Sequence, residues 1–340
     1  IDVRLVGSEM CIRDSHNRAN SKGMDLTEME NLEAINKKII EYKNTSVHAV
    51  SIYSNRNENN SSKIIINSLS SNSEIGSVTL DSISSVEGIL NTNNSHDWEN
   101  VNVSERTKVL MDIADEIEAA PYQLIYYLMN EAGKTIQNAI DEIREAIDFL
   151  RYYSNQMIEI DQKDRLLEGP TGEINNLFYS AKGHFLCISP WNFPVAILIG
   201  QISAALVTGN KVTIKPSEHT SILGFLVTQL FHKNGVPLSS LQLVLGDGKH
   251  GDILSRINNL SGVAFTGSLQ TAKRIQNNLN TYQKEIIPLV AETGGINSMI
   301  VDSSALLEQA TDDIVRSAFD SSGQRLSLIH ISEPTRRTSI

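Results

Sequence analysis

The chain has 340 residues, enough for one large domain or two ordinary domains with ample core. Its 29 basic and 40 acidic residues give a formal net charge of −11, which argues against nucleic acid or an anionic membrane as the main partner. The longest apolar stretch, residues 195–207, is too short to cross a bilayer, so we expect a soluble protein.

Both ends of the chain read as translated sequencing adapter. LVGSEMCIRDS at residues 5–15 and LSLIHISEPTR at residues 326–336 are translations of one library-adapter oligonucleotide in opposite orientations. Chance agreement over both segments is negligible. We therefore expect residues 1–15 and 326–340 to be adapter-derived and not native, and we exclude them from the fold prediction.

The N-terminal half is predicted to be mainly helical. Residues 26–42 have apolar positions at helical spacing, which indicates an amphipathic helix. Residues 55–73 are rich in Asn and Ser around a short apolar run and are predicted to form a loop and a strand. Residues 104–155 follow the helical period, and Pro121 and Gly133 divide them.

The periodicity changes after Glu168. Residues 169–183 contain Gly-Pro and Lys-Gly breakers and predict a hairpin. Short apolar strands then alternate with helices: strands at residues 185–189, 211–215, 241–246 and 262–267, and helices at residues 195–208, 221–233, 251–257 and 271–279. This alternation predicts an α/β fold with a doubly wound parallel sheet, whose ligand sites lie at the carboxyl ends of the strands.

A second α/β unit is predicted to start near Ile286, with two apolar runs followed by a helix through Ala318. The predicted division is therefore a connector and N-terminal segment at residues 16–100, a nucleotide-binding domain at residues 101–285 that includes the hairpin near residues 168–183, and the start of a second domain at residues 286–325.

Three motifs carry a resemblance to a known family: ISPWNFP at residues 188–194, AETGGIN at residues 291–297 and AFDSSGQR at residues 318–325. Together they resemble the nicotinamide-dependent aldehyde dehydrogenase superfamily. Within it they are most similar to the L-glutamate γ-semialdehyde (pyrroline-5-carboxylate) dehydrogenase half of bifunctional proline utilization A. NSKGMDL at residues 20–26 is similar to the connector between the two halves of such proteins. The resemblance covers residues 16–325 and implies an aldehyde dehydrogenase-like fold whose second domain is catalytic.

The resemblance implies NAD-dependent oxidation of L-glutamate γ-semialdehyde to L-glutamate in proline catabolism. The parent protein would be a cytoplasmic homo-oligomer acting on a small-molecule substrate, with neither a metal nor a membrane span. An upstream proline dehydrogenase half would carry FAD. In the family a nucleophilic cysteine follows GQR, but position 326 is leucine. This chain is therefore predicted to have no dehydrogenase activity.

Asn192 and Glu292 are the catalytic residues that the resemblance implies. Asn192 follows a strand, and Pro194 is suited to the start of a helix. A carboxamide at this place can stabilise the oxyanion that forms when an aldehyde is attacked, whereas an isolated Asn-x-Pro would more simply be a turn. Glu292 would be the general base that activates water to hydrolyse a thioester, although a lone glutamate is more often structural.

Lys215 and Glu218, in the motif KPSE, would hold the hydroxyls of the adenosine ribose. A carboxylate accepts bonds from both hydroxyls and repels a 2′-phosphate, which favours NAD over NADP. Without the other motifs, a solvated charge pair would be the simpler interpretation. By the same resemblance, the nicotinamide side of the cofactor would lie along Ile188, Ser189, Pro190 and Trp191.

The motif FTGS would approach the pyrophosphate through Phe265, Gly267 and Ser268, where a strand ends and a helix begins. Gly-Ser helix caps are common, so this motif alone is weak. Gly248, in GDGKHG, would be a second point of close approach. The cofactor contacts that the resemblance implies are completed by Glu292, Thr293 and Gly294.

Cys187 is the single cysteine outside the adapter-like segments. It lies in the middle of an apolar strand, which predicts an inert buried thiol and not a replacement nucleophile. One cysteine cannot form an internal disulfide, which favours a reducing cytoplasm. Two alternatives stay open: another semialdehyde dehydrogenase of the superfamily, and a non-catalytic NAD-binding protein.

Overall fold

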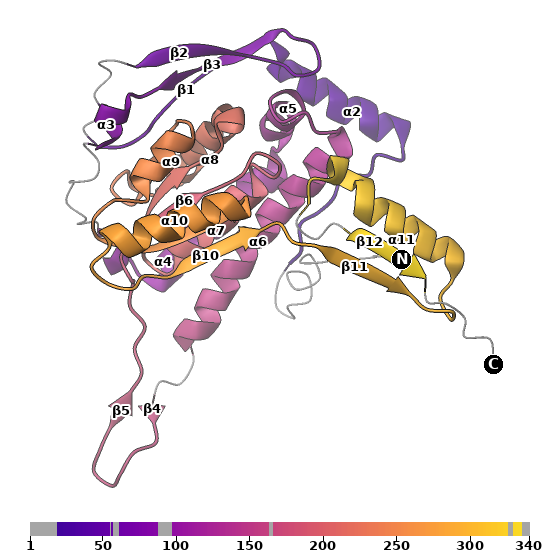
Figure 1. The fold of residues 1–340 in the computed structure, drawn as a ribbon. Helices are drawn as coiled ribbons and strands as arrows, with labels where there is room; N and C mark the ends of the chain where they lie inside the picture. The colour runs from indigo at the N-terminus through magenta and orange to yellow at the C-terminus, as the bar shows by residue number, and fades with distance from the viewer. Residues whose placement is uncertain are drawn as a thin grey trace.

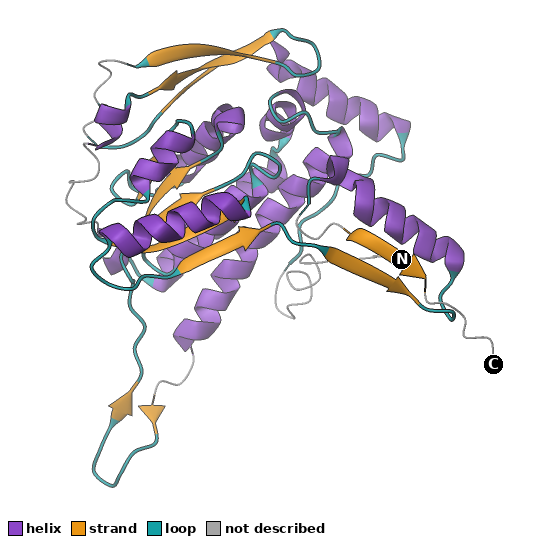
Figure 2. Ribbon diagram, viewed as in Figure 1, coloured by secondary structure: helices purple, strands orange, loops and turns teal. Residues whose placement is uncertain are grey.

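The computed structural model describes residues 19–54, 56, 61–87, 97–162, 166–325 and 329–334. A central sheet has helices on both faces, and a smaller sheet lies beside it near the N-terminal helix (Figure 1). A hairpin projects from the bottom of the view, and the C-terminal elements project to one side (Figure 2). The α/β class with a parallel sheet is confirmed.

The central sheet has five strands in the order β10-β9-β6-β7-β8, and every neighbouring pair is parallel. The strands are β6 (His184–Ile188), β7 (Lys211–Lys215), β8 (Leu241–Leu243), β9 (Leu260–Gly267) and β10 (Leu289–Thr293). From β6 the chain runs outward through β7 to β8, and then returns to the other side of β6 for β9 and β10. The strand order thus reverses between β6 and β9, which is where sheets of this kind bind ligands.

The strand β10 differs in placement from the prediction. The sequence places residues 286–295 at the opening of a second unit, but Leu289 to Thr293 pair in register with Val263 to Gly267 of β9. The unpaired edge of β9 offers backbone hydrogen bonds that a neighbouring extended segment can satisfy. The sheet therefore continues to residue 293, and the domain division as a whole stays a prediction.

Helices cover the sheet as the alternating pattern predicts. Those that connect its strands are α7 (Ala196–Val207), α8 (Ser221–Lys233), α9 (Gly248–Leu254) and α10 (Leu269–Tyr282), with the short helix η4 (Glu218–Thr220) before α8. The predicted helical region forms α4 (Val103–Ala119), α5 (Tyr122–Asn130) and α6 (Ile136–Gln162), and its breaks fall at Pro121 and Gly133. The helix α7 is apolar on nearly every side because it lies between the sheet and α6.

The N-terminal part closes one edge of the central sheet. Its elements are α2 (Met29–Ile40), η1 (Glu41–Asn44), β1 (Val47–Val50), β2 (Ser62–Asn67), β3 (Glu74–Leu80), α3 (Ile83–Glu87) and η3 (Asp97–Asn100), with the sheet order β1-β3-β2. Just after β1, Ile52 exchanges two backbone hydrogen bonds, of 2.8 and 2.7 Å, with Leu243 of β8. The outer edge of β8 is therefore paired at this point.

The two projecting parts are a hairpin and a C-terminal unit. The hairpin pairs β4 (Leu166–Leu167) with β5 (Asn175–Asn176) antiparallel, so that β5 falls within the predicted range of residues 169–183 and β4 lies just before it. The C-terminal elements are β11 (Asn297–Val301), α11 (Leu307–Phe319), η5 (Asp320–Gly323) and β12 (Ile329–Pro334). Residues 329–334 fall in a segment predicted to be adapter-derived, yet they pair with β11 because an open strand edge accepts any extended segment. Residues 1–18, 326–328 and 335–340 lie outside the described residues, so the adapter origin stays a prediction.

Candidate active site

The sheet brings the predicted motifs to one edge. Ile188, the last residue of β6, lies opposite Lys215 on one side and Phe265 on the other. On the next strand pair, Thr293 lies opposite Gly267. Since the strands are parallel, all of these positions are at carboxyl ends. The motifs ISPWNFP, KPSE, FTGS and AETGG, which are far apart in the sequence, therefore meet beside the point where the strand order reverses.

Lys215 and Glu218 form a pair at the end of β7. The Nζ atom of Lys215 lies 3.3 Å from Oε2 of Glu218. Burial lowers the pKa of Lys215, and the carboxylate of Glu218 opposes this shift. Burial would raise the pKa of Glu218, but a backbone hydrogen bond and Lys215 lower it below its ordinary value. The side chain of Glu218 is 42% exposed, so an ionised carboxylate faces solvent at this strand end.

The end of β6 carries polar groups that suit a ligand. The Oγ atom of Ser189 is buried and has no hydrogen-bond partner among the described residues. Gln201 of α7 donates from Nε2 to the carbonyl of Ile188 at 3.3 Å and to Oγ1 of Thr266 at 3.2 Å. Gln201 thus links β6 to β9 across the reversal point, while Trp191 remains exposed beside it.

The predicted pyrophosphate residues begin two helices. Ser268 caps α10, since its Oγ accepts a 3.2 Å bond from the N–H of Thr271. Gly248 is the first residue of α9, and a Cβ atom built there would meet nothing within 4 Å. At Gly267 a Cβ atom would lie 2.7 Å from the ring of Phe265, so only glycine fits without a shift. Open space at Gly248 and the missing Cβ at Gly267 are both compatible with a ligand close to the backbone.

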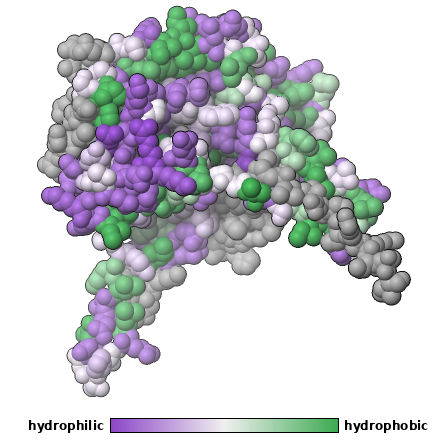
Figure 3. All heavy atoms as spheres, in the orientation of Figure 1, coloured by the Kyte–Doolittle hydropathy of each residue, from purple (hydrophilic) through white to green (hydrophobic). Residues whose placement is uncertain are grey.

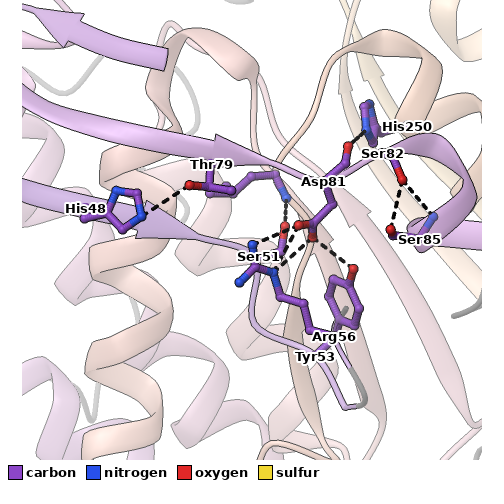
Figure 4. A network of polar contacts seen from close by, with 10 residues as sticks. His48, Ser51, Tyr53, Arg56, Thr79, Asp81, Ser82, Ser85 and His250 are labelled. Atoms are coloured by element: carbon purple, nitrogen blue, oxygen red, sulfur yellow. Dashed lines mark hydrogen bonds and ion pairs between the residues drawn. The ribbon is translucent and has the colours of Figure 1, made fainter. Parts of the chain in front are cut away.

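A network of polar contacts ties the start of α9 to the N-terminal part (Figure 4). Asp81 is fully buried and accepts bonds of 2.9 Å from Tyr53 Oη and from Arg56 Nη2. Its backbone carbonyl accepts a 2.9 Å bond from Nε2 of His250, which lies in α9. Burial and the neighbouring Asp81 raise the pKa of Tyr53. The GDGKHG loop, where Asp247 caps α9, is therefore held from outside the sheet.

Asn192 contacts the C-terminal motif. Its Nδ2 atom donates a 2.6 Å bond to the carbonyl of Gln324, in the GQR sequence. Arg325 lies over the Phe193 ring at 6.0 Å. The turn that follows β6 and the segment that leads to position 326 are thus in direct contact. Leu326 itself lies outside the described residues.

Glu292 is exposed on β10, with β9 between it and the β6 turn that carries Asn192. Burial raises the pKa of Tyr153 on α6, and the nearby charges of Tyr152 and Glu292 add to the shift. After Glu292, Cβ atoms built at Gly294 and Gly295 would meet nothing within 4 Å. The Glu292 side chain is therefore exposed on the edge strand β10, and the two glycines that follow it have open space around them.

Three residues near this edge were missed by the motif analysis. Glu131 is buried and accepts bonds of 2.8 and 2.9 Å from the N–H groups of Ile222 and Leu223, at the start of α8. Glu142 is also buried and forms a 2.8 Å ion pair with Lys134. In the sequence, the segment EAGK at residues 131–134 shows only a helix break at its glycine; the two charged residues that flank this break are the one signal that could have pointed to it.

Cys187 is buried, and burial raises its pKa to about 12. This agrees with the predicted inert thiol, because nucleophilic cysteines need a stabilised thiolate. Within the described part of the chain, no group of three or more His, Cys, Asp or Glu side chains is placed to hold a metal ion. The described helices also include none with the length and apolar character that a bilayer span requires.

Comparison with known proteins agrees with this geometry. The profile described as "Aldehyde dehydrogenase family" matches residues 57–329. The chain is 37% identical over 322 residues to "Bifunctional protein PutA" of Escherichia coli K12, covering 93% of this chain and 23% of that protein. It is 36% identical to "1-pyrroline-5-carboxylate dehydrogenase 1" of Halalkalibacterium halodurans, over 68% of this chain and 45% of the relative. The chain thus spans about a quarter to a half of the length of these relatives.

Solved structures of proteins with these names have a fold similar to that of this chain. The proline utilization A of Bdellovibrio bacteriovorus superposes with a TM-score of 0.86 at 27% identity, covering 93% of this chain and 34% of that one. A 1-pyrroline-5-carboxylate dehydrogenase from Thermus, solved with bound NAD, also gives 0.86, at 25% identity, over 93% of this chain and 63% of that one.

Proposed function

The chain belongs to the aldehyde dehydrogenase family, and from this premise we propose that it carries the NAD site and two catalytic groups of an L-glutamate γ-semialdehyde dehydrogenase. The observation that carries the proposal is the meeting of the motifs ISPWNFP, KPSE, FTGS and AETGG at one sheet edge beside the reversal of strand order. The relatives named after pyrroline-5-carboxylate and proline utilization support this substrate over another semialdehyde.

The residues at this edge fit NAD. Glu218 would accept hydrogen bonds from the two ribose hydroxyls while Lys215 holds its carboxylate in place. Ser268 and the open backbone at Gly248 would lie beside the pyrophosphate. The hydroxyl of Ser189, which has no hydrogen-bond partner among the described residues, and the exposed Trp191 would lie on the nicotinamide side, with Ile188 and Pro190. NAD, when bound, supplies the oxidant for the aldehyde.

Asn192 and Glu292 would provide the catalytic groups of this chain. The carboxamide of Asn192 donates to a carbonyl oxygen two residues before position 326, so it can donate to an oxyanion formed next to that position. Glu292 would take a proton from the water that hydrolyses the thioester. Position 326, where the nucleophile is expected, holds leucine. The whole enzyme would be a cytoplasmic homo-oligomer, fused to an upstream proline dehydrogenase half that carries FAD.

Calorimetric titration of the chain with NAD and NADP tests the cofactor site. We expect NAD to bind more tightly than NADP, because the carboxylate of Glu218 repels a 2′-phosphate. Glu218→Gln should weaken NAD binding by about 10- to 100-fold, since a hydrogen bond to a charged group contributes about 1.5–3 kcal/mol. It should also reduce the preference over NADP. Glu30→Gln, on the exposed surface of α2, is the control. Equal affinity for both cofactors, or no binding of either, would contradict the proposal.

The absence of a nucleophile gives a separate prediction. With L-glutamate γ-semialdehyde and NAD, this chain should produce no NADH, because leucine at position 326 cannot attack the aldehyde. Absorbance at the wavelength of the reduced nicotinamide measures the product. Semialdehyde-dependent NADH formation above a protein-free control would show that another group serves as the nucleophile.

A further inference from the structure

We propose that residues 131–134, in the connection between α5 and α6, together with Glu142 position the two loops that carry Glu218 and Asn192. This inference rests on the proposed function, because it assigns these residues to the geometry of the proposed NAD site. The positioning residues are Glu131, Lys134 and Glu142. None of them is expected to touch the cofactor or the substrate.

Glu131 holds the loop of Glu218. Its two carboxylate oxygens accept the N–H groups of Ile222 and Leu223 at 2.8 and 2.9 Å. These N–H groups belong to the first turn of α8, where four N–H groups have no partner within the helix. Ser221, the first residue of α8, follows Glu218 by only three positions. Fixing the start of α8 therefore fixes the short loop that presents Glu218.

Lys134 and Glu142 hold the turn of Asn192. Oε1 of Glu142 accepts the N–H groups of Val195 and Ala196 at 2.8 and 3.3 Å, at the start of α7. Oε2 of the same carboxylate lies 2.8 Å from Nζ of Lys134. That Nζ also lies over the ring of Phe193, 3.9 Å from its centre, in a cation–π contact. Phe193 directly follows Asn192, so the ammonium of Lys134 packs against the catalytic turn itself.

These contacts differ from ordinary helix capping. The helices α9 and α10 are capped by their own neighbours, Asp247 and Ser268. In contrast, α7 and α8 make no side-chain cap of their own. Their N–H groups are satisfied by carboxylates 53 and 91 residues away in sequence, and both carboxylates are buried at a cost in desolvation. A Ser or Asp before each helix could accept from such N–H groups without burying a distant acidic side chain.

The remote caps have a consequence that local caps lack. A local cap moves with its helix, whereas Glu131 and Lys134 both come from the short connection between α5 and α6. Glu131 holds the start of α8 directly, and Lys134 bears on the start of α7 through Phe193 and Glu142. The ribose side and the reactive side of the site are held at a constant separation.

Two readouts on the intact chain test the proposal. The chain has two tryptophans; Trp98 is 2% exposed and Trp191 is 42% exposed and adjacent to Asn192. Quenching of tryptophan fluorescence by acrylamide therefore reports how accessible Trp191 is to solvent, and it needs no cofactor. The affinity for AMP, which carries the ribose but no nicotinamide, reports whether Glu218 is in position to bind the ribose hydroxyls.

The variants separate the two loops. Lys134→Met should raise the quenching of Trp191 and leave AMP affinity unchanged, and Lys134→Arg, which keeps the cation, should restore the native quenching. Glu131→Gln keeps one acceptor but turns a donor toward an N–H of α8, so it should weaken AMP binding about tenfold without changing Trp191 quenching. Each variant is compared with the wild type well below its urea transition, so that only folded protein is observed.

Asp148→Asn is the matched control. Asp148 is a buried carboxylate on α6 that accepts the N–H and hydroxyl of Ser21 at 2.8 and 3.1 Å, away from both loops. It should lower stability and change neither readout. The proposal is overturned if Asp148→Asn alters the readouts as much as the Glu131 and Lys134 variants do, or if those variants leave both readouts unchanged. If the wild type binds neither AMP nor NAD, the proposed function fails, and the quenching of Trp191 still decides the role of Lys134.

Discussion

Two regions of the molecule carry equally recognisable motifs, but they are held very differently. The motifs ISPWNFP and KPSE lie at the ends of β6 and β7, two strands with almost no exposed side chain. The helices that follow, α7 and α8, are held by the buried side chains of Glu142 and Glu131. The region of residues 296–325 carries GQR, yet Ile300 is 77% and Phe319 is 72% exposed. A motif thus specifies a local chain path, whereas its rigidity comes from the contacts around it.

The helices α10 and α11 show the same contrast. Both are amphipathic, but α10 buries Ala272, Ile275 and Leu279 against the sheet, while Ser317 is the one buried residue of α11. Hydrophobic side chains gather at the surface over the C-terminal helix and on the projecting hairpin (Figure 3). The amphipathic pattern therefore predicts that a helix has an apolar face, but not which partner covers it.

The largest expected difference between the two regions is in thiol reactivity. In a Cys11→Ser chain, Cys187 should react with a thiol reagent at least about 10³-fold more slowly than a cysteine introduced at exposed Ser303, because its labelling requires global unfolding. Its pKa, raised to about 12 by burial, adds to the protection. Absorbance of the released reagent measures both rates. Comparable rates would show that the sheet opens as readily as the C-terminal region.

Truncating one phenylalanine in each region should give the next largest difference. Phe231 of α8 is fully buried, so Phe231→Ala should lower the free energy of unfolding by about 3–5 kcal/mol. Phe319→Ala, in α11, should change it by no more than about 0.5 kcal/mol. Urea denaturation followed by circular dichroism measures both values. A large loss for Phe319→Ala would mean that α11 belongs to the same cooperative unit as the sheet.

The buried anchor Glu131 predicts a pH dependence in the first region. Burial raises its pKa from 4.5 to about 8, so the folded chain binds more protons than the unfolded chain between these values. The contribution of Glu131 to the free energy of unfolding should therefore fall as pH rises from about 5 to 8. Glu131→Gln removes this group, and the difference in stability between wild type and variant should change across that range. A difference independent of pH would contradict the raised pKa.

The smallest change in the free energy of unfolding is expected on the exposed surface of α4. Lys108 and Asp112 form an exposed i,i+4 ion pair on α4. Lys108→Met should cost no more than about 0.5 kcal/mol, because solvent and salt screen such pairs. Lys134→Met, which breaks the buried pair with Glu142, should cost several times more. Similar losses in urea denaturation would show that Lys134 and Glu142 contribute little to the anchoring of α7.

Local patterns in the sequence predict most of the sheet and the motif positions. The strands predicted at residues 185–189, 211–215 and 262–267 match β6, β7 and β9, and the parallel arrangement places their ends together. The pairing of β10 with β9 was not predicted, because periodicity does not say which edge an apolar strand will join.

The anchors of the site were also missed, for a related reason. The bonds of Glu142 to Val195, of Glu131 to Ile222 and of His250 to Asp81 join residues 53, 91 and 169 positions apart. No spacing rule along one element connects such residues. Only the packed arrangement of the helical layer and the N-terminal part against the sheet brings these groups within hydrogen-bonding distance.

The most direct test of the cofactor site is a crystal structure of the chain with NAD. We expect the adenosine ribose hydroxyls on Glu218, the pyrophosphate beside Ser268, and the nicotinamide along the end of β6 next to Trp191. The protein atoms of Lys134 and Glu142 should stay out of contact with NAD. NAD bound away from the carboxyl edge of the five-stranded sheet, or no NAD in crystals grown at saturating concentration, would contradict this assignment.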